Sequence, residues 1–82
     1  MKISIDAGHN DSGWNTGAVG NGRREQDITF EVARRLGDIL SAAGIEIKLS
    51  RPTKATNLGS NNSGSVTARY TMANQWKADL FI

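Results

Sequence analysis

Two side chains of this sequence could share a metal ion, the histidine His9 and the glutamate Glu25. They are separated by a segment rich in Gly, Asn, Asp, Ser and Thr. His9 is the single histidine and cysteine is absent, so a zinc site here has to use imidazole and carboxylate ligands. One His and one Glu are a legitimate zinc pair, but a catalytic zinc needs three protein ligands and a water. The sequence therefore offers part of a zinc site.

Each of the two residues also has a simpler interpretation. His9 can be a solvated imidazole in a loop, because most lone loop histidines have no specific role. Glu25 can be an acidic residue at a helix N-terminus, where the helix dipole and the free N–H groups favour negative charge. The residues alone leave both interpretations open.

The glycines between the two residues do not form a phosphate-binding loop. Gly17 and Gly22 have the spacing of a Walker A motif, but two arginines follow where Lys and Ser or Thr are required. A dinucleotide-binding fingerprint that starts at Gly20 would need its third glycine where Glu25 stands. Nucleotide binding is therefore disfavoured.

Three large aromatic side chains carry a polar group. Tyr70 and Trp76 fit the apolar face of a predicted helix, so packing is their default role. Trp14 lies in the polar loop, where no amphipathic pattern would bury it. An exposed Trp near a binding edge is a candidate for stacking on a sugar ring.

Periodicity and breakers divide the chain into alternating strands and helices. The expected segments are a strand over 2–6, a long loop over 8–22, a helix over 25–43, a strand over 45–49, a loop over 53–64, a helix over 65–77 and a strand over 78–82. The apolar spacing predicts a buried stripe in the first helix of Ile28, Val32, Leu36, Ile39 and Leu40. In the second helix it predicts inward positions at Val66, Tyr70, Ala73 and Trp76.

The β-α-β-α-β order predicts an α/β fold, a mostly parallel sheet flanked by helices, which the sequence leaves truncated in the third strand. Ligands of such open sheets bind outside the C-terminal ends of the strands. His9 follows the first strand, and the residues after Ile82 would follow the third. We therefore expect the site at this edge.

Composition limits the kinds of partner and the cellular location that we expect for this protein. The net charge of +2, from ten basic and eight acidic residues, is too small for a nucleic-acid footprint. No apolar run is long enough to span a bilayer, so membrane insertion is not expected. The N-terminus reaches Asp6 too soon for the apolar stretch of a signal peptide. The absence of cysteine excludes disulfides and suits, without proving, an extracellular destination.

Taken in order, several motifs resemble the opening of the amidase-3 class of N-acetylmuramoyl-L-alanine amidases. The first are Asp6-Ala7-Gly8-His9, Gly17-Ala18-Val19-Gly20 and Glu25. Later positions keep the family's register, namely Gly44-Ile45-Glu46-Ile47, Leu49-Ser50-Arg51, Leu58, Arg69, Ala73-Asn74 and Ala78-Asp79-Leu80-Phe81-Ile82. The resemblance covers nearly the whole chain.

The resemblance implies that residues 1–82 are the N-terminal part of a single amidase catalytic domain. It implies a Zn²⁺ cofactor and hydrolysis of the amide between N-acetylmuramic acid and L-alanine in peptidoglycan. His9 matches the family's first zinc-binding histidine and Glu25 its zinc-binding glutamate. A second histidine and a catalytic glutamate are expected beyond Ile82, so the 82-residue chain alone should be inactive.

By the same resemblance, zinc would polarise the scissile carbonyl and lower the pKa of a bound water, whose proton a carboxylate would take. Asp6 could orient His9 from behind, although a strand-end carboxylate facing solvent is equally open. The family usually has an acidic residue shortly after the arginine that Arg51 matches, whereas this chain has Pro52-Thr53-Lys54. The loop over 53–64 is also long and polar, so substrate contacts there cannot be transferred.

The implied place of action is the bacterial cell wall, reached by secretion or by release on lysis. A bacterial autolysin, a sporulation enzyme and a phage endolysin all fit. The alternative from another class is a non-catalytic peptidoglycan-binding or regulatory module that keeps the fold and lacks the complete site.

Overall fold

The three predicted strands form one parallel sheet in the computed structural model, which describes all residues from Met1 to Ile82. The central strand β1 (Lys2–Ile5) lies between β4 (Glu46–Leu49) and β5 (Leu80–Phe81). In the register, Ile3 lies opposite both Ile47 and Leu80. The backbone N–H of Asp6 also donates to the carbonyl of Ile82 at 2.7 Å, which extends the contact with the last strand. The predicted α/β class with a parallel sheet is confirmed.

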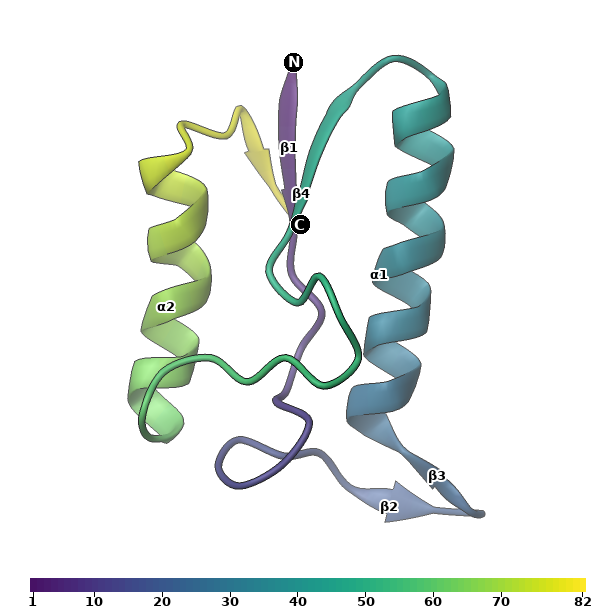
Figure 1. Cartoon of the computed structure of the whole chain (residues 1–82), viewed down its shortest axis with the longest axis vertical. Helices are drawn as coiled ribbons and strands as arrows, with labels where there is room; N and C mark the ends of the chain where they lie inside the picture. Colours follow the sequence, from purple (N-terminus) through teal and green to yellow (C-terminus); the bar gives the residue numbers. More distant parts are fainter.

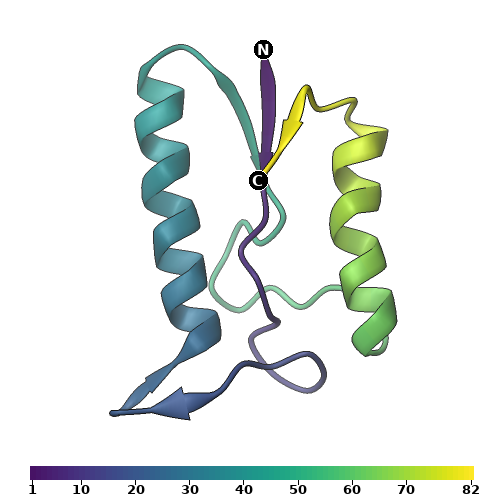
Figure 2. The same cartoon turned by 180° about the vertical axis from the view of Figure 1, so that it is seen from behind.

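The two long helices lie on opposite sides of this sheet (Figures 1 and 2). Helix α1 (Glu25–Ala42) leads from β1 to β4 at one edge, and α2 (Asn62–Gln75) leads from β4 back to β5 at the other edge. The direction of winding therefore reverses at β1. In open α/β sheets, such a reversal leaves a crevice for ligands at the C-terminal ends of the strands.

The apolar core fills the space between the sheet and α1. Its buried members are Ile3, Ile5, Ala7 and Ala33, with Leu36, Leu40, Ile45, Ile47 and Leu49 packed against them. The prediction was wrong for Ile28, Val32 and Ile39, which are exposed. The small residues Ala33 and Gly37 face the strands instead, and a Cβ on Gly37 would already touch the Leu49 side chain at 3.4 Å. Small side chains on this face let the helix approach the sheet closely.

Helix α2 presents a different face from the one that its apolar residues predicted. Val66 and Tyr70 are about half exposed, whereas Ser65, Arg69 and Ala73 are buried at successive i,i+4 positions. Ala73 was the buried residue that the prediction identified correctly. Ser65 and Arg69 face inward because the loop after β1 offers polar partners there, with Asn10 Oδ1 accepting from both side chains. The orientation of this helix is therefore set by hydrogen bonds of its polar side chains, not by its apolar residues.

The end of the long loop predicted over 8–22 forms a short hairpin with the two residues that follow it. Strands β2 (Val19–Gly20) and β3 (Arg23–Arg24) pair antiparallel around Asn21 and Gly22 (Figure 1). Both turn residues have positive φ, 52° and 72°, as a type I′ turn requires. The hairpin leads directly into α1 and so fixes where Glu25 begins that helix.

Helix α2 begins before the predicted position because Asn61 caps it. The Asn61 side chain accepts a hydrogen bond from the backbone N–H of Gly64 at 2.7 Å. We expect Asn61→Ala to lower the free energy of unfolding by about 1 kcal/mol, measured by urea denaturation. Asn74→Ala is the matched control, because the Asn74 side chain is exposed near the end of the same helix. An equal loss in both variants would contradict the capping role.

Candidate metal centre

His9 and Glu25 meet at the C-terminal edge of the sheet. The Nε2 atom of His9 lies 2.9 Å from Oε2 of Glu25. His9 lies in the loop that leaves β1, the strand at which the winding reverses, and Glu25 is the first residue of α1. Their side chains are 32% and 51% exposed, so a bound ion and a substrate can reach both from solvent. The two residues that the sequence singled out are thus brought together by the fold.

The backbone around the pair is unusual at two points. His9 adopts φ of 68°, in the left-handed region that non-glycine residues rarely enter. Gly17 passes so close that a Cβ there would lie 2.4 Å from Cβ of Glu25 and 3.0 Å from Cδ2 of His9. The site therefore requires a glycine at position 17 and local constraints that hold His9 in a strained conformation.

The donor atoms of this pair fit zinc chemistry. An imidazole nitrogen and a carboxylate oxygen are both common zinc ligands, and two ligands of a tetrahedral zinc lie roughly 3.3 Å apart. The 2.9 Å between Nε2 and Oε2 is a hydrogen-bond contact, a few tenths of an ångström shorter than this separation, so the pair would open slightly to admit an ion. The structure contains no group of three or more His, Cys, Asp or Glu side chains placed to hold a metal ion. These two residues would therefore supply two ligands.

Sequence comparison decides the family. A family model described as N-acetylmuramoyl-L-alanine amidase, the amidase-3 class, matches residues 3–82. The chain belongs to this family. The match confirms the resemblance that the sequence motifs indicated.

Individual relatives agree with this assignment. The chain is 37% identical over 84 aligned residues to the sporulation-specific N-acetylmuramoyl-L-alanine amidase of Bacillus subtilis, and 36% identical to the N-acetylmuramoyl-L-alanine amidase CwlM of Bacillus licheniformis. Both alignments include 100% of this chain but only 29% and 30% of the relatives. A third relative, the amidase LytC of Bacillus subtilis, is 34% identical over 98% of the chain and 14% of its own length. The chain thus spans less than a third of these amidases.

Asp6, the candidate for orienting His9, makes other contacts. Its Oδ1 accepts hydrogen bonds from Ser50 Oγ at 2.6 Å and from Arg69 Nη1 at 2.7 Å. The Nδ1 atom of His9 is buried and has no hydrogen-bond partner. The Asp6 side chain is only 22% exposed, so the alternative of a carboxylate that faces solvent does not hold either. In this structure Asp6 acts on Arg69 and Ser50 and makes no hydrogen bond to the imidazole.

A pocket of about 260 Å³ lies beside His9. Its lining residues are Asp6, Gly8, His9, Asn15, Val66, Arg69, Tyr70 and Phe81. Trp14, the predicted sugar-stacking residue, is not among them, and its Nε1 donates to the carbonyl of Leu58 at 3.0 Å. A stacking role for Trp14 stays a prediction, whereas Tyr70 and Phe81 are the exposed aromatic residues that line the pocket with His9.

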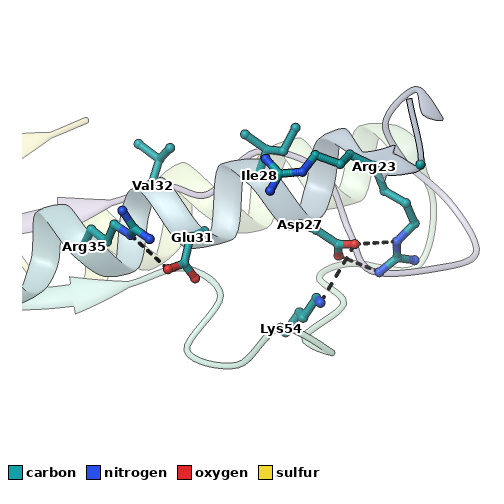
Figure 3. A pocket seen from close by; sticks show the side chains of 9 residues that line it. Arg23, Asp27, Ile28, Glu31, Val32, Arg35 and Lys54 are labelled. Atoms are coloured by element: carbon teal, nitrogen blue, oxygen red, sulfur yellow. Dashed lines mark hydrogen bonds and ion pairs between the residues drawn. The ribbon is translucent and has the colours of Figure 1, made fainter. Parts of the chain in front are cut away.

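A larger groove, of about 470 Å³, runs along the outer side of α1 (Figure 3), and His9 is not among its lining residues. Its charges are largely paired, with Asp27 between Arg24 and Lys54 and Glu31 beside Arg35. Hydrogen bonds from Arg34 and Arg35 hold the pKa of Glu31 at about 2. The groove contains neither residue of the candidate metal pair, so we do not assign the chemistry to it.

The residues that sequence reasoning missed are buried polar side chains around the His9 loop. Asn10 is fully buried, donates to the carbonyl of Leu58 and accepts from its N–H, both at 3.0 Å. Arg51 and Arg69 are 0% and 4% exposed. Leu58, Arg51 and Arg69 were noted only as family matches, and that match was the one sequence signal that could have identified them.

None of the helices is long and apolar enough to cross a membrane.

Proposed function

We propose that the protein containing this chain is a zinc-dependent amidase of the cell wall. It would hydrolyse the amide between N-acetylmuramic acid and L-alanine in peptidoglycan. The observation that carries the proposal is the contact between His9 and Glu25 at the reversal point of the sheet, in a chain of the amidase family. Further ligands, and a catalytic glutamate, are proposed to come from residues after Ile82.

In this proposal His9 and Glu25, whose side chains are in contact, would hold the ion. When bound there, zinc would supply Lewis acidity for activating the scissile carbonyl and the attacking water. The neighbouring pocket places Tyr70 and Val66 beside His9, where they can contact the apolar parts of the substrate and limit access of bulk water. The general base that takes the proton of the water is assigned to the glutamate beyond Ile82.

The test is the release of new amino ends from purified peptidoglycan by the intact protein. We expect the free α-amino groups of L-alanine to appear with time, a chelator to abolish their release, and added Zn²⁺ to restore it. Added Mg²⁺ is the control, because zinc and magnesium prefer different ligands. Activity that persists after complete removal of metal would contradict the zinc proposal. Binding to peptidoglycan without new amino ends would instead support a non-catalytic wall-binding module.

A further inference from the structure

We propose that the buried arginines Arg51 and Arg69 are positioning residues for the metal pair. Together they fix the backbone of the loop that carries His9 and tie it to the first turn of α1, which carries Glu25. This inference rests on the proposed function, because it assigns the two arginines a purpose at the same zinc site.

Arg69 holds the loop from the α2 side. Its side chain is 5% exposed, and Nη1 donates to Asp6 Oδ1 at 2.7 Å and to the carbonyl of Ala7. Nη2 donates to the carbonyl of His9 itself at 2.8 Å, and to Asn10 Oδ1 at 2.9 Å. One guanidinium thus contacts every residue from 6 to 10 except Gly8.

Arg51 supplies the missing contact from the other side. Its Nη1 lies 3.1 Å from the carbonyl of Gly8 and 2.9 Å from the carbonyl of Gln26, the residue next to Glu25. Arg51 forms no ion pair with a carboxylate, and burial lowers the pKa of its guanidinium. Backbone carbonyls, together with the ring of Phe30 at 5.7 Å, therefore stabilise this buried cation. The contacts join the His9 loop to the helix that carries Glu25.

As a result, two guanidiniums bind the carbonyls of three consecutive residues, Ala7, Gly8 and His9. This arrangement explains how His9 is kept in the left-handed region, which is strained for a non-glycine residue. If the loop relaxed, the imidazole would turn relative to Glu25 and the spacing of the two donor atoms would be lost. A lysine could not replace either arginine fully, because its single ammonium lacks the planar fork that reaches several carbonyls at once.

The test measures metal affinity of the intact protein apart from activity. Zinc dissociation constants are determined by competition with a chromophoric chelator for wild type, Arg69→Lys, Arg51→Lys and the control Arg35→Lys. Arg35 is 72% exposed and pairs only with Glu31 on the outer side of α1. The visible absorption of the Co²⁺-loaded protein reports the geometry of the ligands, and thermal unfolding of the metal-free protein reports stability. His9→Ala establishes that zinc binds at the proposed pair.

We expect Arg69→Lys and Arg51→Lys each to weaken zinc binding by about 10- to 100-fold and to change the Co²⁺ spectrum, with Arg35→Lys unchanged. If a lysine variant does not fold, Asp6→Asn, which removes the charge that holds Arg69, should weaken zinc binding in the same direction by a smaller factor. Lower stability with unchanged zinc affinity and spectrum would overturn the inference and leave the zinc site standing. Zinc affinity unaffected by His9→Ala would overturn the metal pair, and the inference with it.

Discussion

Replacing either residue of the metal pair should remove both zinc binding and amidase activity from the intact protein. In His9→Ala the imidazole is lost, and in Glu25→Gln a carboxylate becomes a neutral amide of the same size, which is a poor zinc ligand. Loss of a side chain that merely orients a metal ligand costs 10- to 100-fold in affinity or activity. Loss of a ligand itself should therefore lower zinc affinity and amidase activity by more than about 100-fold in each variant. Isothermal titration with Zn²⁺ and the release of L-alanine amino ends measure the two losses.

The exposure of the pair and a matched control sharpen this experiment. Both side chains are partly exposed, so their replacement leaves the core between the sheet and α1 intact. The matched control is Glu46→Gln, the same chemical change at an exposed position of β4. We expect this control to keep wild-type affinity and activity. If Glu25→Gln behaved like Glu46→Gln, Glu25 would be only a helix-terminal carboxylate, the simpler interpretation that its sequence position allows.

The strands could be predicted from the sequence because alternation is a local property. Ile3 and Ile5 alternate with polar residues along the predicted strand, and both are buried. The position of His9 at the ligand-binding edge followed from the same reasoning, since the loop after a parallel strand has to emerge there. The dipeptide Asn21-Gly22 is also a sequence signal for a hairpin turn. It lies within a run of polar residues and glycines, which made the whole segment look like a loop.

The orientation of the helices could not be predicted from apolar spacing. Helix α1 turns Ala33 and Gly37 to the sheet because close approach is decided by small side chains, which a pattern of large apolar residues does not record. Helix α2 buries Arg69 because its partners are backbone carbonyls of a loop far away in the sequence. Such partners are known only once the loop is placed. The contact between His9 and Glu25 could not be predicted for the same reason, because it depends on how the loop between them is placed.

Gly17→Ala should disrupt the pair without removing either ligand. The new methyl group would lie 2.4 Å from Cβ of Glu25, closer than real Cβ atoms approach, and 3.0 Å from Cδ2 of His9. Since Cβ of Glu25 is attached directly to the helix backbone, rotation of a side chain cannot relieve the clash. The loop, or the first turn of α1, has to move. A misplacement of about 1 Å near reacting groups can cost about 100-fold in rate, and we expect a loss of this order in amidase activity.

Gly20→Ala separates this effect from a general intolerance of the hairpin to side chains. A Cβ on Gly20 would meet nothing within 4 Å, and its φ is not in the left-handed region, so we expect activity and zinc affinity close to wild type. Thermal unfolding completes the comparison, because a steric effect confined to the site should weaken zinc binding more than it lowers the stability of the metal-free protein. Wild-type zinc affinity in Gly17→Ala would show that the loop yields without moving the ligands. The close packing of Gly17 against Glu25 and His9 would then not be needed to position the two ligands, and this prediction would be wrong.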